Sequence, residues 1–242
     1  MIKISELLTR RPGMTRAEFH DYWRNVHAPL VMGIPEIRRH NRRYVQCHTQ
    51  PEWFDFLPPG GALYDGVAEI WVDSLDAARQ LFAEPKFAEL VAPDELEFLD
   101  VGKTVILVTD ETTVYERAGA PLTGGVKLFE LAVRRKGTSR AECHRYWSRT
   151  HGPLVLASDQ MTRHIVRYNQ CHSLDDAVSG VPPMRYDGMA ELWFDGMAEL
   201  DAAFSNPQYR DVVHPDEPRF VDPEVSSALV TIEVPIYRRG RD

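Results

Sequence analysis

The chain has 242 residues, of which 43% are hydrophobic, and a formal net charge of −8. This composition is typical of a folded globular protein, and its negative charge repels nucleic acids and anionic membranes, so we expect neither as a partner. Residues 1–11 lack the apolar core of a signal peptide, and no apolar run approaches the roughly 18 residues of a membrane span, so we expect a cytoplasmic protein.

The first predicted elements are a strand over residues 2–9 and an amphipathic helix that begins after Thr15. Thr15 and Glu18 have the spacing of a capping box. One stripe of this helix is formed by residues at helical spacing, namely Phe19, Tyr22, Trp23, Val26, His27 and Leu30. Pro29 has no N–H to donate, so we expect the helix to end or kink just after His27. This would place an imidazole at a helix terminus.

The next predicted strand, residues 42–48, has polar groups on one face, because side chains alternate along a strand. That face carries Tyr44, Gln46 and His48, and the other carries Arg43, Val45 and Cys47. Residues 49–63 form a Pro/Gly-rich loop with three large aromatics, Trp53, Phe54 and Phe56, and such a loop is expected to fold over something. A third strand (66–72), a second helix (74–91) and a fourth strand (103–109) complete a βαββαβ unit.

The whole unit occurs twice. At an offset of 124, 23 of the 46 residues in 3–48 are identical in 127–172, so the helical stretch 15–31 recurs at 139–155. After a two-residue deletion the match resumes, with Tyr-Asp-Gly at 64–66 and again at 186–188. We therefore predict one repeat over 1–110, a linker over 111–125 and a second repeat over 126–242.

A βαββαβ unit places both helices on one face of an antiparallel sheet and leaves an apolar face that must be covered. The second copy can cover it. The sequence thus predicts an α+β fold in which two ferredoxin-like repeats pack sheet to sheet as an intramolecular barrel. It leaves open whether two chains assemble further into a homodimer.

Four motifs resemble those of the EthD family, in the dimeric α+β barrel superfamily: F-H-x-Y-W-x-x-x-H-A-P-L, R-Y-V-Q-x-H, Y-D-G-x-A-E-x-W-x-D and D-E-x-x-F-x-D. The resemblance covers nearly all of both halves. It implies relatives such as methylmuconolactone isomerases, polyketide cyclases, anthrone-type dehydratases and cofactor-free monooxygenases. It also implies a substrate between helices and sheet, and an acid or base role for His27 and His151. Cys47 and Cys171 depart from the small amide expected in the second strand.

The two histidines are our candidates for acid/base catalysis, because an imidazole titrates near neutrality. The alternative is a core histidine bonded to a backbone carbonyl. The second-strand face is our candidate for holding a carbonyl or phenol oxygen, and its groups are Tyr44, Gln46 and His48 with Tyr168, Gln170 and His172. Its alternative is that the face points into the barrel and these groups bond one another.

Glu69 and Glu191 lie in strands of mostly apolar residues, where a carboxylate must be paired or have a raised pKa. A raised pKa would suit a proton carrier in the substrate pocket. An ion pair with Arg43 or Arg167 is the alternative that we favour. Glu6 and Glu130 pose the same question. The aromatic candidates for contact with a substrate are Tyr22, Trp23, Tyr146 and Trp147, and core packing is the alternative for all four.

The sequence has no metal-ligand spacing, nucleotide-binding glycine motif or serine-hydrolase elbow, so we expect neither a metal nor a cofactor. We predict a cofactor-free lyase, isomerase or cyclase that acts on a hydrophobic cyclic or aromatic carbonyl compound. The alternatives are an accessory protein that binds such a compound, or oxygen chemistry, either cofactor-free or through haem. Because Val26 becomes Thr150 and the long loops differ, we also predict two unlike pockets, with one of them catalytic.

Overall fold

The computed structural model describes residues 1–50, 63–119, 124–157, 159–174 and 185–240. Most of the predicted aromatic loop, including Trp53, Phe54 and Phe56, lies outside this description. Among the described residues, no helix is long and apolar enough to cross a bilayer.

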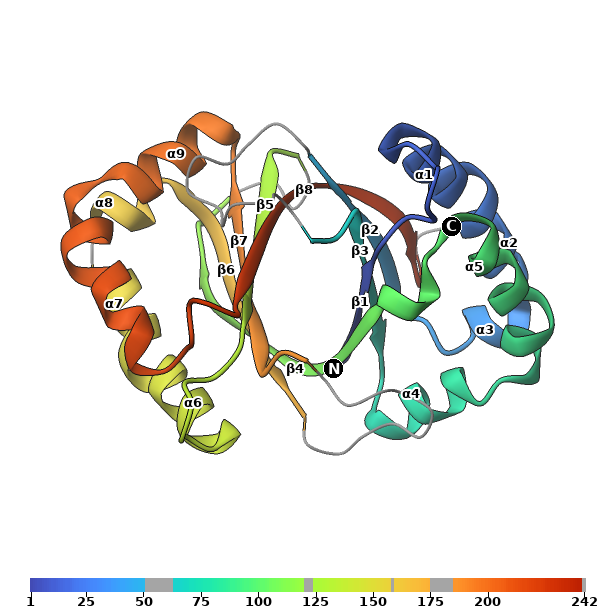
Figure 1. Cartoon of the computed structure of the whole chain (residues 1–242), viewed down its shortest axis with the longest axis horizontal. Coiled ribbons are helices and arrows are strands. Elements are labelled where there is room, and N and C mark those ends of the chain that lie inside the picture. The colour runs from blue at the N-terminus through green and yellow to red at the C-terminus, as the bar shows by residue number, and fades with distance from the viewer. Residues whose placement is uncertain (51–62, 120–123, 158, 175–184, 241–242) are drawn as a thin grey trace.

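Eight antiparallel strands close into one barrel, in the order β1-β3-β2-β8-β5-β7-β6-β4 (Figure 1). The strands are β1 Ile2–Leu8, β2 Arg43–Thr49, β3 Gly66–Val72, β4 Val105–Glu116, β5 Val126–Ala132, β6 Ile165–Ser173, β7 Gly188–Phe194 and β8 Ser227–Arg238. The predicted α+β fold of two βαββαβ repeats that share a barrel is confirmed.

The two repeats are joined by the long strands β4 and β8. The first part of β4 pairs with β1 in its own repeat, and the part from Thr109 to Glu116 pairs with β6 in the other. β8 is arranged in the same way: its first part pairs with β5 in its own repeat, and the part from Thr231 onward pairs with β2 in the other. The first residues of the predicted linker 111–125 are therefore strand, a correction to that boundary. The two sheets meet through continuous backbone hydrogen bonds as well as through side chains.

Each repeat covers the outer face of its own strands with helices, so that two helical layers flank the barrel (Figure 1). The first layer contains α1 Arg16–Tyr22, η1 Trp23–His27, α2 Ala28–Gly33, α3 Pro35–Arg38, α4 Leu75–Phe82, η2 Phe87–Val91, α5 Ala92–Phe98 and η3 Val101–Lys103. The second contains α6 Arg140–Tyr146, η4 Trp147–His151, α7 Gly152–Leu156, α8 Asp159–Thr162, α9 Met197–Ser205, η5 Tyr209–Val213 and η6 His214–Arg219. Both predicted capping boxes are present, at Thr15 and Ser139.

Of the two predicted outcomes at His27, an end or a kink, the first does not occur. The first helix passes through the π-helical turn η1, in which the N–H of Ala28 bonds the carbonyl of Trp23, and continues as α2. Pro29 accounts for the wider turn, because it has no N–H for the α-helical bond and a π-turn shifts the register around it. His27 therefore lies within a helix at a π-turn. His151 stands at the same point before Pro153 in the second repeat.

The Tyr-Asp-Gly motif fixes the start of the third strand beneath this helix. The carboxylate of Asp65 accepts bonds from the backbone N–H of Arg10 and from Nε of Arg16, each at 2.9 Å. Gly66 leaves room for an indole, because a Cβ at that position would lie 2.6 Å from the ring of Trp23. The motif thus sets how closely the first helix approaches the sheet.

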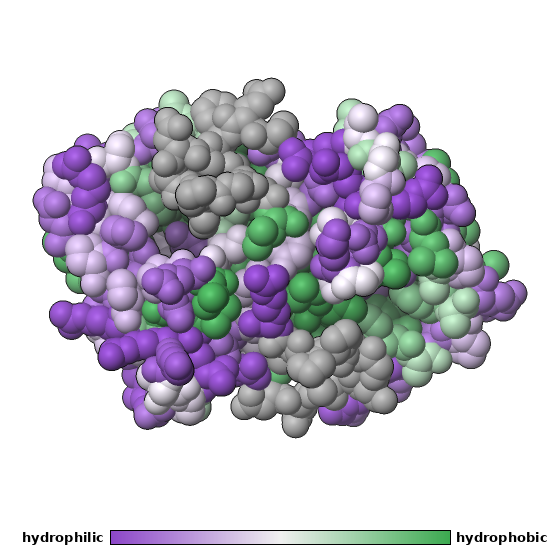
Figure 2. All heavy atoms as spheres, viewed as in Figure 1, coloured by the Kyte–Doolittle hydropathy of each residue, from purple (hydrophilic) through white to green (hydrophobic). Residues whose placement is uncertain are grey.

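The barrel interior is not wholly apolar, although we expected the apolar faces of the two sheets to meet there. An apolar cluster fills much of it, but buried Lys and Glu side chains lie there as well. The outer surface seen in Figure 2 is largely hydrophilic and is interrupted by hydrophobic patches.

Candidate functional site

Each repeat has a cavity between its helical layer and the outward face of its strands. The cavity of the second repeat measures about 210 Å³, and that of the first about 40 Å³. Both are lined by the histidine of the π-turn, the tryptophan before it, the tyrosine of the second strand and two glutamates; these are His151, Trp147, Tyr168, Glu130 and Glu217 in the larger cavity, and His27, Trp23, Tyr44, Glu6 and Glu95 in the smaller.

The two cavities are unlike in size, as predicted, but for a reason that the sequence comparison did not identify. Leu8 lines the small cavity, whereas the equivalent residue of the large cavity is Ala132. Ser227 and Ala228 also line the large cavity, at the positions that Val105 and Ile106 occupy in the first repeat. Smaller side chains on the second sheet therefore leave more space under the second helical layer.

In the larger cavity the histidine is held by an aspartate. His151 Nδ1 lies 3.0 Å from Asp216 Oδ2, and the hydroxyl of Tyr146 donates to Asp216 Oδ1 at 2.7 Å. Asp216 is buried and therefore depends on such partners. Since a carboxylate accepts the Nδ1–H, the tautomer with a free Nε2 lone pair is favoured. Among the described residues, no hydrogen bond joins Nε2 of His151.

The smaller cavity repeats this arrangement. His27 Nδ1 lies 2.7 Å from Asp94 Oδ2, and the hydroxyl of Tyr22 donates to Asp94 Oδ1 at 2.8 Å. Tyr22 and Tyr146 thus orient the aspartates and are not among the residues that line the cavities. The expected alternative for the histidines, a bond to a backbone carbonyl, is not what the structure has.

Burial keeps both histidines neutral near pH 7. It lowers the pKa of His27 and of His151 below the ordinary value, and the nearby aspartates offset this only in part. A neutral imidazole that donates from Nδ1 can accept a proton at Nε2. The electrostatic surroundings therefore suit a general base.

The second strand contributes a hydroxyl whose lone pairs are already used. The Tyr168 oxygen accepts bonds from Trp147 Nε1 at 3.0 Å and from Gln170 Nε2 at 2.9 Å. Its own proton has no acceptor among the described residues, so it can be donated into the cavity. Tyr44 accepts the equivalent pair of bonds from Trp23 and Gln46, each at 3.1 Å.

The remaining second-strand candidates lie beside the cavities and do not line them. Gln46 and Gln170 bond the tyrosines, which agrees with one part of the alternative interpretation, but the face points toward the helices and not into the barrel. His48 stacks on the indole of Trp23 at 4.9 Å, and His172 stacks on His144 at 4.3 Å between ring centroids. Burial lowers the pKa of His48 to about 3 and that of His172 to about 4. These rings are neutral packing elements behind the site.

Each cavity also holds a pair of glutamates near its histidine, and the pair in the larger cavity is a further functional candidate. Burial raises the pKa of all four carboxyls, Glu6 and Glu95 in the small cavity and Glu130 and Glu217 in the large one. Repulsion by Glu6 adds to this at Glu95, and repulsion by Glu217 adds to it at Glu130. Glu6 and Glu130 had been considered, but Glu95 and Glu217 had not. Asp94 and Asp216 had also been missed. The signal for all four was the repeated D-E-x-x-F-x-D motif, which contains both acidic residues.

Glu69 and Glu191 do not belong to either cavity, which corrects their placement in the substrate pocket. They point into the barrel, and their partners are lysines, not Arg43 or Arg167. Lys127 Nζ lies 2.7 Å from Glu69 Oε2 and 3.3 Å from Glu191 Oε2. These attractions hold the pKa of Glu69 below its ordinary value.

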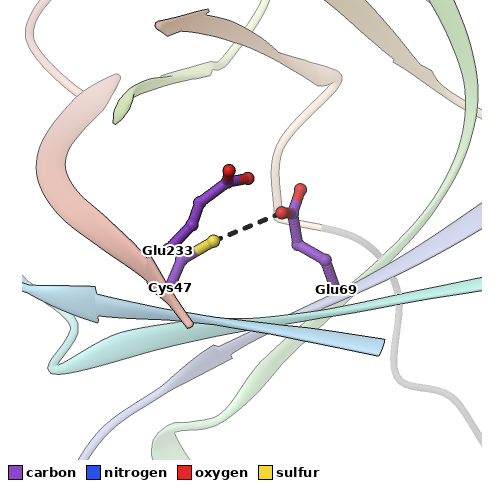
Figure 3. A group of neighbouring side chains, drawn as sticks. All are labelled: Cys47, Glu69 and Glu233. Carbon is purple, nitrogen blue, oxygen red and sulfur yellow. Dashed lines mark hydrogen bonds between the residues drawn. The ribbon is translucent and has the colours of Figure 1, made fainter. Parts of the chain in front are cut away.

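The barrel interior also brings thiols and carboxylates together. Figure 3 shows Cys47, Glu69 and Glu233 pointing toward one another, with the thiol donating to Glu69 at 3.2 Å. One thiolate and two carboxylates so placed can bind a divalent cation. Here, however, the ammonium of Lys127 lies 2.7 Å from Glu69 and 3.6 Å from Glu233, so a lysine already fills the cation position. Burial raises the pKa of Cys47, which also disfavours a thiolate ligand.

Comparison with known proteins agrees with this architecture. A family model described as the EthD domain matches the chain twice, over residues 11–102 and 135–224. A conidial pigment biosynthesis dehydratase of Metarhizium robertsii is 29% identical over 105 residues, a match that covers 41% of this chain and 74% of that protein. Dehydratase ustZ of Ustilaginoidea virens is 28% identical over 106 residues, with 41% and 75% covered. The crystal structure of an anthrone oxidase-like protein has the same fold, with a TM-score of 0.64 at 10% identity over 98% of this chain and 94% of that one.

Proposed function

The chain belongs to the EthD family, and on that premise we propose that it is a dehydratase-type lyase whose working site is the larger cavity. Its substrate would be a hydrophobic cyclic or aromatic carbonyl compound with a hydroxyl on the carbon β to the carbonyl. The observation that carries this proposal is the His151–Asp216 pair in the wall of that cavity. Relatives that are dehydratases support the reaction class.

His151 would act as the base. A proton on the carbon next to a carbonyl is acidic enough to be removed by an imidazole when the resulting enolate is stabilised. Nε2 is the atom that would receive this proton, because Nδ1 is engaged by Asp216. Asp216 would also stabilise the imidazolium that forms.

Tyr168 would stabilise the enolate. Its hydroxyl accepts two hydrogen bonds and lines the cavity, so its remaining proton is directed to a new acceptor such as the carbonyl oxygen. A donor fixed in advance at the place where negative charge develops is an effective way to lower a barrier. Elimination of water then completes the reaction and needs no oxidant or reductant.

Cavity size limits the substrate. A volume of about 210 Å³ is below the roughly 300–1,000 Å³ that is typical of pockets for drug-sized ligands. We therefore expect the substrate to be a compound of one or two rings. By the same comparison, the cavity of the first repeat, at about 40 Å³, is too small for such a compound without rearrangement.

The test uses 3-hydroxy-1-tetralone, a two-ring ketone that becomes 1-naphthol when it loses water. We expect the purified protein to form 1-naphthol faster than buffer does, and to exchange the C2 protons of 1-tetralone, which has no leaving group, with D₂O. If the protein accelerates neither reaction above the buffer rate, the proposal is refuted for this substrate class. Tight binding of 1-naphthol without turnover would favour the accessory role instead.

A further inference from the structure

The larger cavity contains a carboxyl group that the base mechanism does not use. Glu130 lies on the outward face of β5 and lines the cavity together with His151. Among the described residues, its carboxyl group forms neither a hydrogen bond nor an ion pair. An unpartnered carboxyl in a mostly apolar cavity is costly as an anion, so the neutral acid is the stable form.

A second carboxyl lies between the cavity and the surface. Glu217 also lines the cavity, and it accepts bonds from the Tyr209 hydroxyl at 3.2 Å and from His214 Nδ1 at 3.0 Å. The side chain of Glu217 is 22% exposed and that of His214 is 60% exposed. From solvent inward, the order is therefore the exposed His214, then Glu217, then the interior of the cavity.

The first repeat lacks these connections. It keeps both carboxyls, as Glu6 and Glu95, but Phe87 stands in place of Tyr209 and Ala92 in place of His214. Phe87 has no hydroxyl and Ala92 has no titratable group. Among the described residues, hydrogen-bonded groups that lead from solvent to the cavity are therefore present in the second repeat and not in the first, and the second repeat also has the large cavity.

We propose that Glu130 is the general acid that protonates the departing hydroxyl group, and that Glu217 and His214 return a proton to it from solvent. This inference rests on the proposed dehydratase function. It assigns the acid and the base to opposite sides of one site, Glu130 from the sheet and His151 from the helices.

Atoms and charges balance in the proposed step. His151 takes the proton as the C–H bond breaks, the C=C bond forms, and the C–O bond breaks as the oxygen takes the proton of Glu130 and leaves as water. Glu130 is then a carboxylate, and it is reprotonated through Glu217 and His214. His151 releases its proton to solvent, so one substrate gives one product and one water.

The charges around Glu130 are consistent with a proton donor. Burial and the neighbouring Glu217 raise the pKa of Glu130 to about 8, and His214 opposes this in part. Burial also raises the pKa of Glu217, whereas the hydrogen bond from Tyr209 lowers it. The other titratable groups of the cavity are His151, which is neutral, and Tyr168.

The decisive experiment separates the role of Glu130 as the acid from the role of His151 as the base. In E130Q we expect elimination of water from 3-hydroxy-1-tetralone to fall at least ~100-fold, a loss of the size expected for a missing general acid, while proton exchange of 1-tetralone in D₂O stays within about threefold of wild type. E6Q changes the equivalent carboxyl of the first repeat and should leave both activities unchanged. If E130Q keeps full elimination, the inference fails although the proposed function stands. If wild type shows neither activity, the proposed function fails.

Two further readouts test the relay and the protonation state. In H214A we expect turnover to fall about tenfold at low buffer concentration and to be restored by added imidazole, which a purely structural defect would not show. The infrared spectrum at pH 7 should contain a carboxylic acid C=O band that is lost in E130Q. Absence of that band in wild type would overturn the inference whatever substrate the protein takes.

Discussion

His151 and Asp216 come from two helical segments that are 65 residues apart, yet Nδ1 of one lies 3.0 Å from Oδ2 of the other. Both side chains are buried, and the hydroxyl of Tyr146 occupies the second oxygen of the carboxylate. The geometry therefore leaves one atom of the imidazole, Nε2, for chemistry. The same relationship in the first repeat, between His27 and Asp94, stands beside a cavity about five times smaller.

The first prediction concerns the two histidines. H151A should lower the turnover number on 3-hydroxy-1-tetralone by about 10²–10⁴-fold, as expected for loss of a general base. H27A, the matched variant in the small cavity, should change it less than threefold. Steady-state kinetics of both variants, with melting temperatures to confirm folding, checks this. Equal losses in the two variants would show that the larger cavity is not the single working site.

The second prediction concerns Asp216. D216N removes a charge that raises the pKa of His151, so the acid limb of the pH–rate profile should move to lower pH. Turnover should also fall by about tenfold or more, because the imidazole loses the acceptor that fixes its tautomer. The Michaelis constant should change little, since Asp216 does not line the cavity. A profile with an unchanged acid limb would rule out the positioning role.

The fold followed from the sequence because two periodicities and an internal duplication specify it. Strand alternation placed Tyr44 with Gln46, and Tyr168 with Gln170, on one face of each second strand, and the structure turns that face toward the helices. The π-turns were not foreseen, because a proline after a histidine indicates a break but does not say whether the helix resumes. The positions of both histidines depend on that detail.

The sequence was less informative about the site because its partners are distant along the chain. Asp216 is 65 residues from His151, and nothing local to either residue indicates the pairing. Glu69 and Glu191 were misplaced for a related reason. A lone carboxylate in an apolar strand indicates that a partner exists, but its partners, Lys3 and Lys127, come from the first strand of each repeat.

The third prediction uses the residue that separates the two cavities. A132L introduces into the large cavity the side chain that Leu8 supplies in the small one. We expect binding of 1-naphthol to weaken at least tenfold, because the added atoms occupy ligand space. Thermal stability should be unchanged or slightly higher, since an existing cavity is filled. Isothermal titration and calorimetry measure both, and undiminished binding would place the ligand elsewhere.

The fourth prediction concerns the stability of E130Q as a function of pH. Burial raises the pKa of Glu130 to about 8 in the folded protein, whereas an unfolded glutamate titrates near 4.3. Between these values the folded state binds more protons, so this residue's contribution to stability is complete below about pH 4 and is lost as pH rises to about 8. E130Q cannot ionise. Its stability relative to wild type should therefore increase from pH 5 to pH 9, by up to about 4 kcal/mol.

Urea unfolding of wild type and E130Q at pH 5, 7 and 9 gives this difference directly. E142Q is a suitable control, because Glu142 is exposed and lies in a capping box at the surface. Its stability difference from wild type should not rise over the same range. A flat difference for E130Q would mean that its carboxyl group ionises normally in the folded protein.

The last prediction concerns the lysines inside the barrel. Lys127 is fully buried, and its ammonium contacts Glu69 and Glu191. K127M removes one of the two positive charges that compensate these buried carboxylates and leaves Lys3 as their remaining lysine partner, so we expect a loss of about 3–5 kcal/mol in the free energy of unfolding. E69Q combined with K127M should recover part of this loss, because it removes a negative charge at the same time. K103M breaks the exposed pair with Asp100 and should cost less than about 1 kcal/mol. If K127M were as mild as K103M, Lys127 would not be compensating the buried carboxylates, and protonation of the glutamates would have to account for their burial.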